Sequence, residues 1–389
     1  LEPSTAIGKI ATRESRMKSA ITPPLEGILV LDLSRMIPGA MLARQLIDLG
    51  ARLIKVEEPG AGDPMRLVPP QVGDMSLGYA AMMRGAESVA LDLRQPEGAA
   101  AIRAIARRAD VVVENFRPGT LERWELGWEE LRRDNPRLVW CSITSFGSEG
   151  EEARRVGHDL NFVAETGALR AMRRDGISTI QLADVGAALL ATSSILGALL
   201  ARERTGEGRR VEQPLATGPL PFVTWSWADA AAGGGSGMEA LLGGLCPCYR
   251  TYPCADGREI SVGALEPKFW ITLTELLGVP ETAAAGLDVG EEGERAAEAV
   301  AAAFASRPLE HGLELGVEHD PPLAPVNDAA TAVSMAVDHG VAWIERTPLP
   351  DGGFLPTPAP FVAGGRTPDR PAPALGEHTE AVLREFGIV

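Results

Sequence analysis

Two short stretches of the chain carry the residues with the clearest chemical potential, Gly157–Phe162 (GHDLNF) and Leu182–Asp184 (LAD). His158 is the first histidine of the chain, and the other four all follow Glu310. Imidazole is the side chain whose unperturbed pKa lets it both accept and donate a proton near neutral pH. A carboxylate close to it in space can serve as a second acid or base. We therefore predict that His158 and Asp184 face each other across an acidic carbon of a substrate.

Length and composition narrow the class of protein. A chain of 389 residues predicts two or three domains, and 45% apolar with 23% charged residues is typical of globular proteins. A net charge of -16 argues against nucleic acid or an anionic membrane as the main partner, while leaving room for an anionic ligand in a local basic pocket. Neither a membrane-spanning run nor the apolar core of a secretion signal is expected, which favours the cytoplasm.

The four cysteines do not suggest a disulfide framework in a chain of this length. Cys246, Cys248 and Cys254 follow the spacing C-x-C-x5-C, which is not a zinc pattern, and no histidine lies near them. We expect buried thiols and no metal site.

The first part of the chain alternates between apolar runs and segments with helical spacing, which predicts an α/β fold with a parallel sheet. The expected strands are Gly27–Leu33, Arg52–Glu57, Ser88–Leu93, Asp110–Glu114, Leu138–Thr144 and Arg209–Glu212. The expected helices are Ala40–Leu49, Pro96–Arg108 and Val185–Ala201, with Pro38 and Gly39 breaking the chain before the first and 58–80 forming a long surface loop. The first strand–helix turn lacks G-x-G-x-x-G, which disfavours NAD or FAD.

A smaller α+β domain is expected over 245–335, with a hairpin around Ala255–Gly257 followed by helices at Lys268–Leu277 and Glu291–Ala305. The remaining boundaries are an N-terminal extension at 1–24, a large α/β domain at 25–215, a linker at 216–244 and a C-terminal return to the large domain at 336–389. The glycine-rich tract Gly233–Gly237 motivates the linker.

The expected topology also places the two chemical stretches. Ligands of parallel α/β sheets bind outside the carboxyl ends of the strands, and His158 follows the loop after the fifth expected strand. Asp184 precedes a long expected helix, where the helix dipole would lower the pKa of an exposed carboxylate. We interpret Asp159 as a structural hydrogen-bond acceptor rather than a base.

Several long segments, spread in order over most of the chain, resemble the α-methylacyl-CoA racemase branch of the CaiB/BaiF (class III) coenzyme A transferase family. They are LEGILVLDLSRMIPGAMLARQLIDLGARLIKVEEPG, SVALDLRQPEGAAAI, VVENFRPGTLERWELGWEEL, NPRLVWCSITSFGSEG, GHDLNF, LAD, RTGEGRRVE, ADGREISVGALEPKFW and GEHTEAVLREFG. The resemblance implies a large Rossmann-like domain built from both chain ends, a small middle domain and interlocked homodimers with shared active sites. It also implies neither a metal nor a redox cofactor.

The activity implied by the resemblance is racemisation or epimerisation at the α-carbon of a 2-methylacyl-CoA, with the acyl-CoA as substrate. His158 and Asp184 would be the two bases, and Glu266 of the partner subunit would assist the histidine. Inversion beside a thioester needs a base on each face. The enolate oxygen needs fixed donors, which we expect from backbone N–H groups at the helix start near Asp184. The alternative is a class III CoA transferase in which Asp184 is the nucleophile that forms an acyl anhydride and then a thioester.

The candidate substrate-binding and CoA-binding residues lie in strand-end loops and around the histidine. They are Arg35, Arg84, Leu91, Asp92, Leu93, Arg94, Arg117, Gly157, Asp159, Leu160, Asn161 and Phe162.

Four departures from the family pattern accompany these candidates. Glu58 stands where members commonly carry arginine, and Ala86-Glu87 stands where they commonly read K-[RS]. Val185–Leu189 (VGAAL) stands where the racemases have a glycine-rich run, and Phe162 replaces a usual tyrosine. The basic positions are associated with CoA phosphates, so a third alternative is a repurposed homologue that acts on a carrier-bound or other non-CoA substrate. The arginines expected to compensate are Arg35, Arg66, Arg84, Arg94 and Arg117.

Overall fold

The computed structural model describes residues 22–172, 179–234, 237–339, 343–362 and 364–389. The chain divides into two compact units. The large unit comprises Leu1–Pro221 and Val333–Val389, and the small unit comprises Phe222–Ala332. The large unit is therefore built from both ends of the chain.

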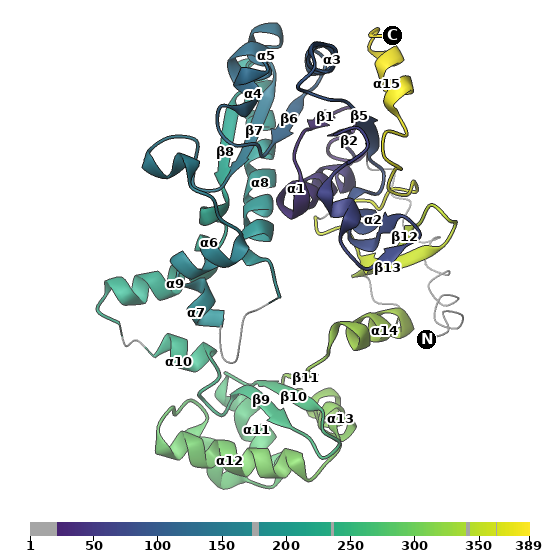
Figure 1. The fold of residues 1–389 in the computed structure, drawn as a ribbon. Coiled ribbons are helices and arrows are strands. Elements are labelled where there is room, and N and C mark those ends of the chain that lie inside the picture. The colour runs from purple at the N-terminus through teal and green to yellow at the C-terminus, as the bar shows by residue number, and fades with distance from the viewer. Residues whose placement is uncertain (1–21, 173–178, 235–236, 340–342, 363) are drawn as a thin grey trace. The chain divides into compact units, whose positions relative to one another are not determined.

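A parallel sheet of six strands forms the centre of the large unit within the described residues, in the order β5-β2-β1-β6-β7-β8 (Figure 1). The strands are β1 Leu29–Asp32, β2 Arg52–Glu57, β5 Glu87–Ala90, β6 Val111–Glu114, β7 Val139–Thr144 and β8 Arg210–Pro214. Leu31 pairs with Ile54 on one side and with Val112 on the other, so the carboxyl ends of β1, β2 and β6 lie at one edge. The predicted α/β fold with a parallel sheet is confirmed.

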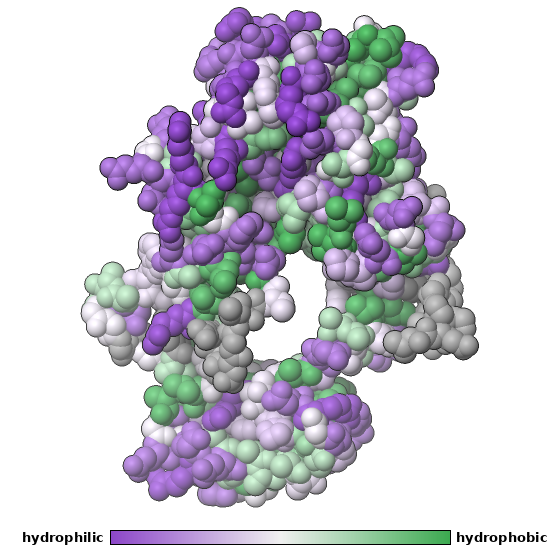
Figure 2. All heavy atoms as spheres, in the orientation of Figure 1, coloured by the Kyte–Doolittle hydropathy of each residue, from purple (hydrophilic) through white to green (hydrophobic). Residues whose placement is uncertain are grey.

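Helices cover both faces of this sheet because the strands alternate their apolar side chains. Val111 and Val113 pack in a cluster with α1, α2 and α8, whereas Val112 packs in a cluster with α3, α4, α5 and α15. The large-unit helices are α1 Met36–Asp48, α2 Leu77–Met83, α3 Pro96–Ala106, α4 Thr120–Arg123, α5 Trp128–Asp134, α6 Asp159–Glu165, α7 Ala168–Met172, α8 Leu182–Thr205 and α15 Thr379–Glu385. Figure 2 shows hydrophilic residues gathered on the outer surface over α3 and α5.

The first helix begins earlier than the sequence suggests. Helix α1 starts at Met36, so Pro38 and Gly39 lie inside its first turn and do not break the chain. Proline is tolerated there because the first N–H groups of a helix have no intrahelical partner. A Cβ at Gly39 would lie 1.9 Å from Oγ of Ser34, so the glycine permits close approach of the preceding loop.

The expected loop over 58–80 also contains regular structure. It includes the 3-10 helix η2 Pro64–Leu67, the strand pair β3 Gln71–Val72 and β4 Met75–Ser76, and the start of α2. Side-chain oxygens of Asp63 and Ser76 accept hydrogen bonds from the first turns of η2 and α2. These local caps stabilise turns that hydrophobic periodicity alone does not reveal.

Helix α8 begins at Leu182 rather than Val185, so Asp184 lies within its first turn. By length and composition this helix would also be able to cross a membrane. Half of its apolar window is buried, and it packs against α1, β7 and β8. A core helix of a globular domain passes the same test.

The segment 216–244 is more structured than the expected linker. It contains the short 3-10 helix η4 Leu215–Thr217 at its start, then α9 Leu220–Ala231 and α10 Met238–Leu242. Helix α9 ends at Ala231, shortly before Gly233 and Gly234 adopt positive φ angles. The C-terminal part adds α14 Ala329–His339 and the antiparallel pair β12 Ile344–Pro348 and β13 Phe354–Pro358.

The small unit contains a three-stranded antiparallel sheet in the order β11-β10-β9. Its elements are β9 Tyr249–Pro253, β10 Glu259–Gly263, α11 Pro267–Leu277, α12 Glu291–Ala305, α13 Leu309–His319 and β11 Leu323–Pro325. Cys246, Cys248 and Cys254 of this unit are buried, as predicted, and Sγ of Cys246 lies 3.8 Å from Sγ of Cys248. Within the described part of the chain, no group of His, Cys, Asp and Glu has the arrangement of a metal site.

Candidate active site

The structure joins the two chemical stretches through one carboxylate. Asp159 is the first residue of α6, and its Oδ1 accepts the backbone N–H of Ala183 at 2.6 Å and of Asp184 at 3.0 Å. The start of α6 is thereby clamped to the start of α8. His158 immediately precedes α6, and its N–H donates to Oδ1 of Asn161 at 3.0 Å. The interpretation of Asp159 as a structural acceptor is confirmed.

Close packing holds this junction in place. The Phe162 ring is fully buried and meets the ring of Phe146 edge-on, with centroids 5.2 Å apart. A Cβ at Gly157 would lie 2.8 Å from Cε1 of Phe162, and one at Gly218 would lie 2.2 Å from the carbonyl oxygen of Ala183. Both glycines thus allow neighbouring backbone to approach the first turns of α6 and α8. Gly157 and Phe162 have packing roles here, whereas Leu160 is exposed.

The environment of Asp184 raises its pKa to about 6. Burial is the main cause, the nearby Asp159 carboxylate adds to it, and His158 opposes it. Asp159 directly follows His158 in the chain, so its contact with the first turn of α8 brings His158 near Asp184. The lowered pKa expected for an exposed carboxylate does not apply, because Asp184 is only partly exposed. Asp184 can therefore change its ionisation near neutral pH.

The backbone donors expected for an enolate at the start of α8 are already used, so this prediction is wrong. The N–H groups of Ala183 and Asp184 donate to Asp159, and the N–H of Val185 donates to the carbonyl of Gln181 at 3.0 Å. The first N–H groups of a helix usually have no partner within the helix. Here the buried carboxylate of Asp159 accepts two of them. Donors for an enolate must come from elsewhere.

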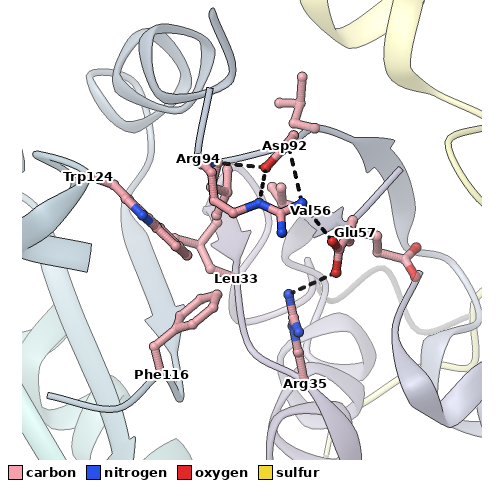
Figure 3. Close-up of a pocket in the computed structure, with 11 residues that line it drawn as sticks. Leu33, Arg35, Val56, Glu57, Asp92, Arg94, Phe116 and Trp124 are labelled. Carbon is pink, nitrogen blue, oxygen red and sulfur yellow. Dashed lines mark hydrogen bonds and ion pairs between the residues drawn. The ribbon is translucent and has the colours of Figure 1, made fainter. Parts of the chain in front are cut away.

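A pocket of about 260 Å³, which we call the strand-end pocket, lies beyond the carboxyl ends of β1, β2, β5 and β6 (Figure 3). It is lined by Leu33, Arg35, Val56, Glu57, Glu58, Leu91, Asp92, Leu93, Arg94, Phe116 and Trp124. Six of the predicted binding or departure positions thus meet in one cavity. The rings of Phe116 and Trp124 line one side of it, and Arg35 and Arg94 point into it (Figure 3).

Glu58 bridges the two arginines of the strand-end pocket. Its Oε1 lies 2.8 Å from a guanidinium nitrogen of Arg94, and its Oε2 lies 3.9 Å from one of Arg35. Arg94 is also paired with Asp92 at 2.8 Å. Two of the five arginines expected to compensate for Glu58, Arg35 and Arg94, therefore pair with Glu58 itself.

Arg84 and Arg66 lie in surroundings that argue against the binding roles expected of them. Arg84 is fully buried and paired with Asp48 at 2.8 Å. Arg66 pairs with Glu57 at 2.7 Å and stacks on the ring of Tyr79. Burial raises the pKa of Glu57, but the hydrogen bonds from Arg66 outweigh it together with further contacts, so the pKa of Glu57 is lowered. Both arginines serve the core of the large unit.

The two acidic departures, Glu58 and Glu87, lie at opposite ends of the sheet. Glu87 is the first residue of β5, and both its oxygens accept hydrogen bonds from Arg52, at 3.0 and 2.8 Å. Arg52 is the first residue of β2, so this ion pair lies at the amino ends of the strands. Glu87 therefore lies away from the carboxyl ends of the strands, where Glu58 would contact a bound ligand.

Arg117 lines a second pocket of about 300 Å³, together with Glu114, Trp140, Ser142 and Arg210. Burial raises the pKa of Glu114 to about 7, against hydrogen bonds from Ser142 and the N–H of Phe116. Glu114 is not among the site residues predicted from the sequence. The sequence feature that could have identified Glu114 is its place as a carboxylate at the end of the apolar strand VVVE.

Glu266 lies in the small unit, at the residue before α11, and is exposed. Its assignment as a residue that assists the histidine stays a prediction.

The parallel α/β fold, the strand-end pocket and the clamped His158–Asp184 junction define the class as an α/β enzyme. The family model for CoA-transferase family III matches residues 25–379, and the chain belongs to this family. The chain is 32% identical over 380 residues to α-methylacyl-CoA racemase of Homo sapiens, covering 94% of each chain. It is 31% identical over 378 residues to acetyl-CoA:oxalate CoA-transferase of Acetobacter aceti, covering 93% of this chain and 96% of the relative.

Solved structures agree with this assignment. A CAIB/BAIF family protein from Brucella suis has a TM-score of 0.79 and 27% identity, over 94% of this chain and 100% of that one. Relatives of comparable identity thus include both racemases and transferases.

Proposed function

We propose that the protein inverts the α-carbon of a 2-methylacyl-CoA thioester by two-base proton transfer. The observation that carries the proposal is the pair of hydrogen bonds from the first turn of α8 to Asp159, which bring Asp184 near the preceding residue, His158. Two side chains that exchange protons near neutral pH are what inversion beside a thioester carbonyl requires.

In this mechanism one base removes the α-proton and the other returns a proton to the opposite face. A pKa of about 6 makes Asp184 ionised in most molecules at neutral pH, yet still able to donate after it has accepted a proton. The imidazole of His158 has the matching capacity for both steps. Each positioned proton transfer contributes roughly 10²–10⁴-fold to the rate.

The test is deuterium incorporation at the α-carbon of each enantiomer of a 2-methylacyl-CoA in heavy water. Wild-type protein should exchange both enantiomers and invert them. Asp184→Asn and His158→Ala should each lose inversion, because each lacks one base, and each should lose exchange with a different enantiomer. His319→Ala, which removes an exposed histidine of the small unit, is the control. Full inversion by either base variant would refute the proposal.

The second candidate is CoA transfer between carboxylic acids, which the names of several relatives favour. Asp184 would then attack the thioester carbonyl, forming an acyl anhydride and releasing the CoA thiolate. The thiolate would attack the aspartyl carbonyl of this anhydride, which forms an aspartyl thioester and releases the donor's carboxylate. The acceptor carboxylate would take CoA by the reverse of these two steps. Hydroxylamine or borohydride present during turnover should trap an adduct on Asp184 if transfer occurs, and mass spectrometry of the peptide would detect it. Inversion without a trapped adduct would favour the racemase.

We also propose that the protein works as a homodimer. On helix α9, Phe222 is 56% exposed and Trp225 is 66% exposed. Exposed aromatic side chains close together on one helix are typical of interaction surfaces. Sedimentation of the wild type beside a Phe222→Ser, Trp225→Ser variant would measure the dimer and its dependence on this face. A monomeric wild type would contradict it.

A further inference from the structure

The charges of the strand-end pocket cancel one another. Its cations are Arg35 and Arg94, and its carboxylates are Glu57, Glu58 and Asp92. Glu57 is engaged by Arg66, outside the lining residues, through contacts of 2.7 and 2.8 Å. The remaining two carboxylates balance the two guanidiniums. An anionic ligand entering this pocket therefore meets no net positive charge.

Glu58 is the carboxylate that both guanidiniums share. In Figure 3 the interactions drawn from Arg35 and Arg94 end on the two oxygens of one carboxylate, which the distances of 3.9 and 2.8 Å identify as Glu58. All three side chains are partly exposed: 44% for Arg35, 58% for Arg94 and 33% for Glu58. Exposed ion pairs contribute little to stability, so this arrangement is open to ligands rather than a fixed part of the core.

The remainder of the pocket suits a ligand with a flat ring and an attached anionic group. The rings of Phe116 and Trp124 meet edge-on with centroids 5.6 Å apart, and the Arg35 guanidinium lies 5.4 Å from the centroid of Phe116. Guanidinium pairs bind phosphate groups through charge-assisted hydrogen bonds. Here the carboxylate of Glu58 lies where a phosphate bound by both arginines would have to lie. A phosphate must displace Glu58 and remain close to its charge.

We propose that Glu58 is a specificity-determining residue, whose carboxylate takes the place of a ligand phosphate between Arg35 and Arg94. The pocket then gives CoA little advantage over thioester handles with fewer phosphate groups, such as dephospho-CoA and pantetheine. This inference rests on the proposed function, because it concerns the handle of the same thioester substrate.

The test compares the affinities of ligands with decreasing numbers of phosphate groups for the full-length protein, by titration calorimetry. CoA, dephospho-CoA and pantetheine are titrated into wild type, Glu58→Gln and Glu129→Gln. Glu129 is exposed on α5, so its replacement changes the net charge equally without touching the pocket. Glu58→Gln should bind CoA about tenfold more tightly than wild type, dephospho-CoA with a smaller gain and pantetheine without gain. The gain for CoA should shrink as salt is added, because it is electrostatic.

Three outcomes would overturn the inference. Equal CoA affinity of wild type and Glu58→Gln, or undetectable CoA binding by that variant, would show that the charge of Glu58 does not weaken CoA binding. An equal gain for pantetheine would show that the substitution opens the pocket instead of changing its charge. The exchange assay of the proposed function is run on the same proteins. Exchange without a CoA-selective gain overturns only the role of Glu58, and a gain without exchange overturns only the racemase.

Discussion

Two clusters of the large unit contain the same groups, two arginines sharing one carboxylate, in opposite environments. In the buried cluster, Asp48 lies 2.8 Å from both Arg44 and Arg84, and every side chain is at most 2% exposed. In the strand-end pocket, Glu58 lies between Arg35 and Arg94, all partly exposed. The chemical groups are equivalent, so burial decides their role.

The buried cluster ties distant parts of the chain together. Arg44 donates to the carbonyl of Ala81 and to that of Pro358, each at 2.6 Å, which links α1, α2 and β13. Burial lowers the pKa of Arg84 to about 10, against the attraction of Asp48. Buried charges of this kind are stable only as a complete set. The pocket cluster has water as an alternative partner, so it can exchange its carboxylate for a ligand.

The largest expected effect breaks the buried cluster. Asp48→Ala leaves two guanidiniums without their shared carboxylate and should lower the free energy of unfolding by about 3–5 kcal/mol. Urea denaturation followed by circular dichroism measures this loss. Asp48→Asn, which retains the oxygen acceptor, should be less damaging and keeps the prediction testable if the alanine variant does not fold. A loss below about 1 kcal/mol for both would contradict a structural role.

A buried carboxylate without a paired guanidinium sharpens the comparison. Burial raises the pKa of Glu114 from 4.5 to about 7, so its contribution to stability is fully present below pH 4.5 and is lost as pH rises through 7. At about 1.4 kcal/mol per pKa unit, the loss is roughly 3 kcal/mol. Glu114→Gln should remove this fall and unfold at higher urea than wild type at pH 8. Identical pH profiles of the two proteins would refute the assignment.

The carboxylate beside Asp184 gives an intermediate case. Asp159→Asn keeps a side-chain oxygen for the N–H groups of Ala183 and Asp184 but removes a negative charge that raises the pKa of Asp184. The acidic limb of the pH–rate profile should move below the value of about 6 expected for the wild type. Because Asn is also a good capping residue, stability should change by no more than about 1 kcal/mol. An unmoved limb would mean that Asp159 does not act on Asp184.

The smallest expected effect concerns stability in the pocket cluster. Glu58→Gln should change the free energy of unfolding by less than about 1 kcal/mol, because exposed ion pairs contribute little. The same urea experiment that detects the loss in Asp48→Ala provides the contrast. A loss of the size expected for Asp48→Ala would place Glu58 among the structural residues and remove the distinction between the clusters.

The order of strands and helices was predictable because apolar runs of strand length alternate with helical segments. The boundaries of β2 and α12 were predicted to the residue, whereas the start of α1 was not. Gly39 and Pro38 normally interrupt helices, and only contact with Ser34 explains why a glycine lies inside α1. The hairpin of β12 and β13 also went unrecognised, because prolines at its ends and centre obscure a strand pattern.

For the site, residue types and spacing were sufficient to single out His158, Asp184 and a structural Asp159. Arg35, Arg94 and Asp92 were proposed as binding residues from the family resemblance, and the structure brings them together in the strand-end pocket. Residue types and spacing did not distinguish Arg84 from these arginines, because the sequence does not show whether a guanidinium faces water or the core.

The sequence by itself determined the parallel α/β architecture and the family, and it supplied the two stretches proposed to carry the chemistry, because these depend on local periodicity and on contiguous motifs. Only the tertiary structure decided which charges meet. In the folded chain, Asp159 accepts the N–H groups at the start of α8 that were expected to bind an enolate. Glu58 lies at the carboxyl ends of the strands and Glu87 at their amino ends. The energy of a charge depends on its partners and its exposure to water, and both are set by residues distant in the chain.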